Sequence, residues 1–350
     1  MKHNPTIVLA LICGFAVAEP SFGNWSIGQT VSTTSGRVLG HAAQDVPNVS
    51  EYLGIPYAAA PVGARRFQPP APYNGSLFIN GSDFGPGCMQ PSATFPQSED
   101  CLTINVWTKP QTGERSARQP AYSGRFFAND SDVVLMSINY RLGIFGFPGN
   151  PASHANLGLL DMRLALEWIQ QNAESFGGDP SRISVFGQSA GAGMADFYAY
   201  AYASDPIANG FVLQSATVNG FPALTKNSTS ARWFRITKAV GCGGITADHD
   251  VVTDCMKNRT SQQIFGAFSA EETSVARAGY LMGDNANEAG AFRGLQPNRS
   301  EAYWNDFNFR YYTCADAVRV GQAWSLSRRR TSFWDAPSDT TKHCSGVGDG

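Results

Sequence analysis

The pentapeptide Gly187-Gln188-Ser189-Ala190-Gly191 constrains the fold of this chain more than any other feature. Ile183–Phe186, directly before it, predicts a short strand, and Ala190–Tyr202, which overlaps its end, predicts a helix. A direct turn from strand to helix strains and crowds the backbone, so it favours glycine on both sides. The pattern therefore predicts a sharp turn with Ser189 at its tip, near the positive end of a helix dipole.

The segments around this turn alternate between strand and helix patterns. Gly28–Phe67 is typical of small antiparallel strands joined by turns, and Leu102–Trp107 alternates as a strand does. Asp132–Tyr140 holds a nearly continuous apolar run, which predicts a strand buried on both faces, as in a parallel sheet. Leu159–Ala173 has apolar residues at helical spacing. This order predicts an α/β fold.

Composition limits the class of protein. The chain has 350 residues, of which 43% are hydrophobic and 15% charged, and this suits one large globular domain. The net charge of −2 gives no sign of nucleic-acid binding, which favours a basic face. A small neutral or apolar substrate fits better.

Residues 1–18 have the pattern of a secretory signal peptide. Lys2 is followed by the short apolar run Thr6–Val17, and Ala16-Val17-Ala18 forms a cleavage site. An N-terminal membrane anchor is the alternative interpretation. Since no later stretch is apolar enough to span a bilayer, we expect a secreted, extracellular protein without a membrane span.

Six cysteines follow the signal segment, and an even number in an oxidising compartment predicts disulfides. Fifteen pairings are possible in principle. Loop-closure entropy favours the two pairs that are close in sequence, Cys88–Cys101 and Cys242–Cys255, and leaves Cys314–Cys344. Acceptor sequons for N-glycosylation support the same compartment, at Asn24, Asn48, Asn74, Asn80, Asn129, Asn227, Asn258 and Asn298.

Several motifs together resemble the type-B carboxylesterase/lipase family, which includes cholinesterases and secreted fungal lipases. They are Gly54–Ala58 with Pro61–Gly63 and Arg66-Phe67, Glu99–Leu102, Asn139–Gly143, Gly158–Asp161, Phe176–Pro180 and Ser189–Gly191. The resemblance implies an α/β-hydrolase fold over residues 19–324, with a mostly parallel central sheet flanked by helices. It also implies that a cysteine just upstream pairs with Cys101, which supports Cys88–Cys101.

The resemblance further implies hydrolysis of a small-molecule carboxylic ester without metal or organic cofactor. Ser189 in its nucleophile elbow would form an acyl-enzyme, and the backbone amide of Ala190 would donate to the oxyanion. Glu288 matches the position of the triad acid, which orients a catalytic histidine.

The chain departs from the family pattern in blocks. His343 is the single histidine after Glu288, and its surroundings do not match the family, so the base stays unassigned. Pro110–Pro120 is polar where the family has an apolar strand and a glycine run for the oxyanion. Phe265–Tyr280 is too short for the family's approach to the acid. Residues 325–350 are typical of disorder or of a tail foreign to the family.

Three functions follow as alternatives. The first is ester hydrolysis by an incomplete hydrolase domain, with activity impaired in this form. The second is a non-catalytic, cholinesterase-like binding protein, against which the intact elbow at Ser189 argues. The third is an inactive, truncated product, because loss in blocks resembles skipped exons.

Overall fold

The computed structural model describes residues 25–75, 77–91, 95–109, 124–130, 133–217 and 226–269. These described residues divide into two compact units: those within 1–89, 95–142 and 160–183 form the first, and those within 90–91, 143–159 and 184–269 form the second. The described strands are β1 (Val31–Thr33), β2 (Gly36–Leu39), β3 (His41–Ala43), β4 (Val46–Pro56), β5 (Phe78–Asn80), β6 (Gly87–Cys88), β7 (Gln97–Ser98), β8 (Thr103–Thr108), β9 (Leu135–Ile138), β10 (Ser184–Gln188) and β11 (Gly210–Gln214). The described α-helices are α1 (Gly124–Asp130), α2 (Gly143–Gly146), α3 (Leu157–Asn172), α4 (Ala190–Ala201), α5 (Lys226–Ala239), α6 (His249–Lys257) and α7 (Ser261–Gly266).

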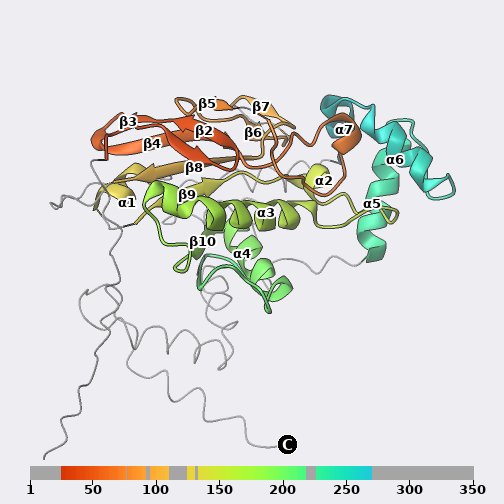
Figure 1. Cartoon of the computed structure of the whole chain (residues 1–350). Coiled ribbons are helices and arrows are strands. Elements are labelled where there is room, and N and C mark those ends of the chain that lie inside the picture. Colours follow the sequence, from red (N-terminus) through yellow and green to blue (C-terminus); the bar gives the residue numbers. More distant parts are fainter. Residues whose placement is uncertain are drawn as a thin grey trace, which may run out of the picture. The chain divides into compact units, whose positions relative to one another are not determined.

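The first unit is built on a four-stranded sheet in the order β3-β4-β8-β9, in which every neighbouring pair is antiparallel (Figure 1). All six residues of β8 are buried, because β8 lies between two strands and packs on both faces. A smaller sheet in the order β1-β2-β5 adds Val31 and Val38 to the same apolar core. The expectation of small antiparallel strands in Gly28–Phe67 is thereby confirmed.

The strand β9 differs from its sequence-based expectation. The apolar run predicted burial on both faces, yet all four residues of β9 are half-buried and Val133 just before them is 45% exposed. Within the described residues β9 pairs only with β8, and it does so antiparallel. A strand at the edge of its sheet keeps more solvent contact than one between two neighbours, which explains the difference.

Helix α3 confirms the helix predicted over Leu159–Ala173, with a boundary shift of one or two residues. Its inner face places Ala165 and Trp168 in the core cluster of the first unit. Trp168 Nε1 donates to Ser35 Oγ at 2.8 Å, so the buried indole nitrogen is satisfied. A short 3-10 turn, Ala173–Phe176, then ends at Gly177, whose φ of 85° favours glycine.

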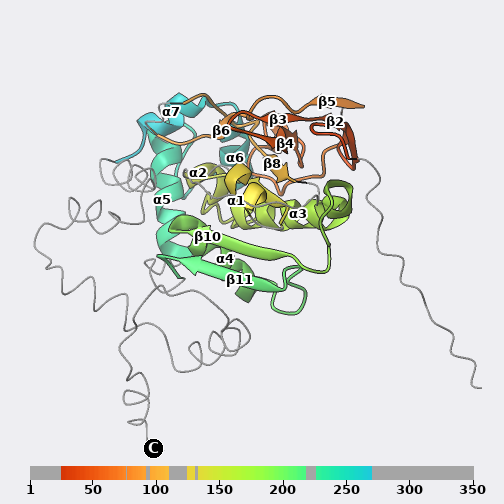
Figure 2. The same cartoon turned by 90° about the vertical axis from the view of Figure 1, so that its left-hand side faces the viewer.

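The second unit contains β10, β11 and α4, which lie together in Figure 2. The two strands are parallel, with Phe186 opposite Val212, and α4 packs against both. Strand β11 was not predicted, although the apolar run Phe211–Leu213 after Gly210 carries a strand signal. This parallel pair joined by a helix is the α/β element that the sequence pattern predicts.

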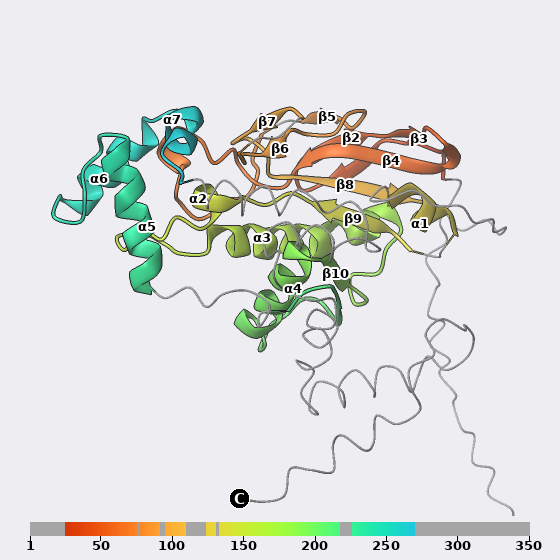
Figure 3. The same cartoon turned by 180° about the vertical axis from the view of Figure 1, so that it is seen from behind.

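Helices α5, α6 and α7 also belong to the second unit (Figure 3), as does the short helix α2. The rings of Phe234 in α5 and His249 in α6 lie 4.9 Å apart between centroids. Arg235 Nη1 donates to the carbonyl of Ala267, just after α7, at 2.9 Å. None of the described helices combines the length and the apolar character that crossing a membrane requires.

Both disulfides expected from loop length are present. Cys88 is bonded to Cys101 in the first unit, and Cys242 is bonded to Cys255 in the second, each across 13 residues of sequence. The third expected pair, Cys314–Cys344, lies outside the described residues, as do residues 1–18 and 325–350.

Candidate functional site

Ser189 occupies the turn between β10 and α4 in a strained backbone conformation. Its φ is 51° and its ψ is −117°, a region that costs a residue other than glycine about 1–3 kcal/mol. Two backbone hydrogen bonds hold it there: Ser189 N donates to Gln214 O at 2.8 Å, and Gly193 N donates to Ser189 O at 3.0 Å. The strand-to-helix turn predicted from the pentapeptide is confirmed, and β11 is the neighbour that fixes it.

The two glycines of the pentapeptide have different roles. A Cβ at Gly187 would lie 2.3 Å from the carbonyl carbon and oxygen of Gly191, so only glycine fits there. A Cβ at Gly191 would meet none of the described atoms outside its own helix turn within 4 Å. The expectation that crowding requires glycine is therefore confirmed for Gly187, whose Cα lies close to the first turn of α4. At Gly191 the described residues leave room for a side chain, against that expectation.

The hydroxyl of Ser189 does not cap the helix that follows it. A serine at this position usually accepts a hydrogen bond from an amide of the first helical turn. Here the side chain makes no capping bond and has no hydrogen-bond partner among the described residues. The strained backbone keeps the hydroxyl out of the cap, so it remains available for chemistry.

The amide of Ala190 is the first N–H of α4 and makes no hydrogen bond to an acceptor in the described residues. The first amides of a helix lack partners within the helix and carry the positive end of its dipole. Negative charge that develops beside Ser189 would therefore be favoured at this end of α4, which is twelve residues long.

Glu288, the expected triad acid, lies outside the described residues. His343 and the segment Pro110–Pro120, where the chain departs from the family pattern, also lie outside them. Three histidines are described, and none has a hydrogen bond with Ser189. His41 Nε2 lies 3.6 Å from Glu51, His249 Nε2 lies 3.4 Å from the carbonyl of Ile245, and His154 is exposed in a loop. The described residues also contain no cluster of three or more metal-ligating side chains.

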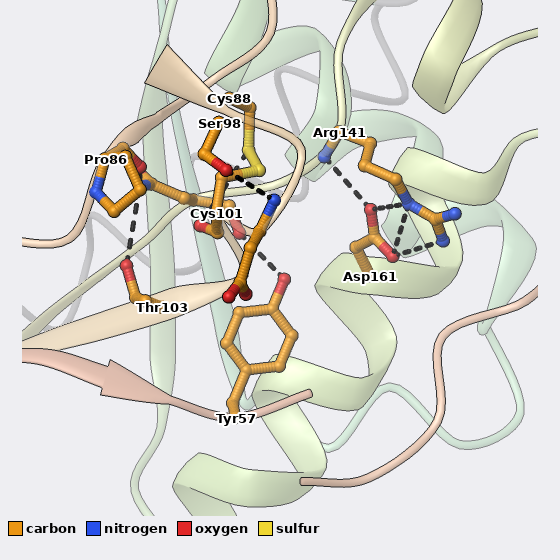
Figure 4. Close-up of a disulfide and its surroundings, with 10 residues drawn as sticks. Tyr57, Pro86, Cys88, Ser98, Cys101, Thr103, Arg141 and Asp161 are labelled. Atoms are coloured by element: carbon orange, nitrogen blue, oxygen red, sulfur yellow. Dashed lines mark hydrogen bonds and ion pairs between the residues drawn. A yellow bond between two sulfur atoms is a disulfide. The ribbon is translucent and has the colours of Figure 1, made fainter. Parts of the chain in front are cut away.

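Two ion pairs, one buried and one partly buried, involve charged residues of the family motifs to which the sequence analysis gave no role. Arg141, which follows β9, binds the carboxylate of Asp161 in α3 through Nε and Nη2, and its own backbone N–H also donates to Asp161 at 3.0 Å (Figure 4). Arg66 binds Glu99 through Nε at 2.6 Å and through Nη2. The charged residues inside these motifs are the signal that could have drawn attention to both pairs.

The disulfide Cys88–Cys101 lies near a set of hydrogen bonds made by Tyr57 and Asn139 (Figure 4). The hydroxyl of Tyr57 donates to the carbonyl of Asn139 at 2.7 Å, and Asn139 N donates to Thr103 O at 3.0 Å. Burial raises the pKa of Tyr57 well above its ordinary value, and the nearby charge of Asp161 raises it further. The motif segments around Asn139 and Cys101 are thereby tied to β4 and β8.

These motifs and the elbow are shared with a known family. A sequence model of the carboxylesterase family matches residues 28–287, and the chain belongs to this family, whose members have the α/β-hydrolase fold. This chain is 33% identical over 303 residues to an acetylcholinesterase from Danio rerio, and the aligned region covers 74% of this chain and 46% of the relative. It is 34% identical over 270 residues to a cholinesterase from Mus musculus, covering 67% of this chain and 44% of the relative.

A fungal relative has a different name. The chain is 30% identical over 281 residues to a chlorogenic acid esterase from Aspergillus niger, and the aligned region covers 69% of this chain and 54% of the relative. The chain thus spans about half the length of the curated relatives that it matches.

Proposed function

We propose that this chain hydrolyses small-molecule carboxylic esters through a serine acyl-enzyme. The single observation that carries the proposal is the geometry of Ser189, which is strained, does not cap its helix and sits at the N-terminus of α4. Membership of the carboxylesterase family supports the same reaction class.

In the proposed reaction the hydroxyl oxygen of Ser189 bonds to the ester carbonyl carbon. The amide of Ala190 donates to the resulting oxyanion. The bond between carbonyl carbon and alkoxy oxygen then breaks, the alcohol leaves with the serine proton, and water later cleaves the acyl-enzyme. Glu288 would orient the base that carries the proton between these groups.

The substrate in this proposal is a small-molecule ester rather than a nucleic acid. The relatives named above are called acetylcholinesterase, cholinesterase and chlorogenic acid esterase, so their names cover both choline and aromatic esters. Neither group of esters is favoured by a described residue of this chain.

We expect the activity to be low. Pro110–Pro120 is polar and contains one glycine, where the resembling family has a glycine run that donates to the oxyanion. Loss of one such donor costs about 100- to 1,000-fold in rate. The base is also unassigned, and a triad without its base loses several orders of magnitude.

The proposal also places the protein outside the cell. Residues 1–18 would act as a signal peptide, residues 19–324 would form the hydrolase domain, and residues 325–350 would lie outside it. Two disulfides in the described residues support an oxidising compartment.

The test is hydrolysis of p-nitrophenyl butyrate by the full chain secreted from a eukaryotic host, together with labelling by a fluorophosphonate. We expect weak hydrolysis and labelling that Ser189→Ala abolishes. The matched control is Ser204→Ala, which removes an exposed serine in the turn after α4 and should leave both signals unchanged. A folded, secreted protein without either signal would reject the enzyme and support a binding role.

A further inference from the structure

The parallel strands β10 and β11 end at the same level, and a strained serine follows each of them. Gln188 and Gln214 are the last register partners of the two strands. The next residues, Ser189 and Ser215, both have positive φ, 51° and 61°. A positive φ is unfavourable for residues other than glycine. The strain at Ser189 therefore has a counterpart on the neighbouring strand.

A single peptide plane links Ser215 to Ser189. Ser189 N donates to Gln214 O at 2.8 Å, and this carbonyl lies in the planar peptide unit that ends at the nitrogen of Ser215. Rotating the plane by half a turn would bring φ of Ser215 to about −120°, which suits any L residue. The same rotation would point the carbonyl of Gln214 away from Ser189. The positive φ of Ser215 and the hydrogen bond to Ser189 therefore occur together.

The side chains beside this peptide plane do not hold it in place. Gln214 and Ser215 are both exposed, and neither side chain has a hydrogen bond within the described residues. Gln214 is also the last residue of β11. The hydrogen bond from Ser189 N opposes the strain at Ser215, and the net free energy of one hydrogen bond is similar in size to the cost of one positive φ. A substitution at residue 215 can therefore decide the orientation of the plane.

The other end of β11 provides a contrast. Ile207 also has a positive φ, 58°, but its turn is closed by a hydrogen bond of its own, from Ala208 N to Pro206 O at 2.5 Å. Within the described residues this turn has no backbone hydrogen bond with Ser189. Strain at Ile207 should therefore leave Ser189 unaffected.

We propose that Ser215 is a positioning residue for the nucleophile and acts through its backbone. Its positive φ goes with the orientation in which the carbonyl of Gln214 accepts from Ser189 N. When the peptide plane rotates, Ser189 loses this bond and keeps only the one between its own carbonyl and Gly193 N. The inference rests on the proposed function, because the position of Ser189 has a chemical consequence only if its hydroxyl attacks the ester.

The first measurement is amide hydrogen exchange at residue 189 in the full secreted chain, resolved by fragmentation in a mass spectrometer. Ser215→Val should accelerate exchange there by about tenfold, because a β-branched residue strongly disfavours a positive φ. Ser215→Gly should slow it by about fivefold, since glycine adopts this φ without strain. Circular dichroism establishes that each variant is folded, and Ser215→Gly alone tests the coupling if Ser215→Val is not secreted.

The second measurement is the rate of fluorophosphonate labelling as a function of reagent concentration. Ser215→Val should lower the maximal rate by about tenfold and leave the half-saturating concentration unchanged, because a displaced hydroxyl impairs the bond-forming step and not binding. Ser215→Gly should not lower the maximal rate.

Two control variants separate this coupling from general effects of substitution. Ser204→Val places a β-branched residue at an exposed position in the turn after α4, which is not among the residues with positive φ. Ile207→Gly relieves strain at the other end of β11. Both should leave exchange at residue 189 and the labelling rate unchanged.

Two outcomes would overturn the inference. Equal exchange at residue 189 in the parent chain, Ser215→Val and Ser215→Gly would show that the chain after Ser215 moves while the peptide plane does not. Loss of labelling in Ser215→Ala with unchanged exchange would show that the hydroxyl of Ser215 acts itself. A folded parent chain that is not labelled would reject the proposed hydrolysis, while the exchange comparison would still decide the backbone coupling.

Discussion

The two glycines of the pentapeptide around Ser189 differ in whether the structure requires them. Gly187 is required because any side chain there meets the first turn of α4, while Gly191 faces open space within the described residues. The pentapeptide pattern predicts the turn and the serine correctly. It cannot distinguish the two glycines, because that difference depends on the direction of each Cα–Cβ bond and not on residue type.

Substitution of each glycine by alanine should therefore give opposite results. Gly187→Ala should destabilise the protein by about 1–3 kcal/mol through overpacking and reduce fluorophosphonate labelling of Ser189. Gly191→Ala should stabilise it by up to about 1 kcal/mol, since alanine is the better helix former. Urea unfolding of both variants measures the difference, and equal destabilisation would contradict the structure.

The raised pKa of the buried Tyr57 leads to a prediction of how the stability of the fold changes at alkaline pH. Because its pKa is raised in the folded state, the folded protein favours the neutral phenol, and this contribution is complete below the ordinary tyrosine pKa of about 10. It is lost as the pH rises above that value, so stability should fall there.

Tyr57→Phe should make this alkaline fall shallower, while costing about 1 kcal/mol near pH 7 for the lost hydrogen bond to Asn139. The fall should not vanish, because burial also raises the pKa of Tyr140, to about 12. The measurement is the unfolding midpoint between pH 8 and the alkaline limit of the fold, and the exposed Tyr200→Phe, which should leave the slope as it is, serves as control.

Elements of this fold are joined by charges that hydrophobic patterning does not reveal. Helix α3 and strand β8 were predictable within one or two residues, because periodicity reports local geometry. The link from Arg141 to Asp161 was not, because it joins residues twenty positions apart whose contact depends on the tertiary fold. The half-exposed state of β9 was missed for a similar reason, since burial of a strand depends on its neighbours and not on its own composition.

Two acidic residues of α3 give a matched comparison of buried and exposed pairs. Asp161→Asn leaves the buried guanidinium of Arg141 without a counter-charge and should cost about 3–5 kcal/mol. Glu167→Gln breaks the more exposed pair with Arg163 and should cost less than about 1 kcal/mol. Chemical denaturation of both variants tests the order, which a similar cost for the two would overturn.

At the scale of the whole molecule, the described residues of each compact unit contain one disulfide. The pairing was predictable from sequence separation alone, because short loops close at the least entropic cost. The division into units was not predictable, since the chain crosses between them several times and neither unit is one continuous stretch of sequence. The triad acid Glu288 stays a prediction from resemblance and the base stays unassigned, because Glu288 and His343 lie outside the described residues.

Removal of one disulfide should act mainly on its own unit. Replacing Cys242 and Cys255 by serine opens a loop of 13 residues, which costs about 3 kcal/mol in the chain-entropy account. Amide hydrogen exchange should then accelerate in α5 and α6 more than in β4 and β8. Replacing Cys88 and Cys101 should reverse this distribution, and the same exchange pattern for both double variants would contradict the division.

The positive φ of Ser189 favours glycine for stability, whereas ester hydrolysis would require the serine hydroxyl. Glycine adopts a φ of 51° without strain, so Ser189→Gly should leave the folded state equally or more stable while removing the nucleophile. In a protein that no longer used this hydroxyl, replacing Ser189 by glycine would therefore relieve the backbone strain. The chain still encodes serine at the one position of the turn where that choice is thermodynamically unfavourable.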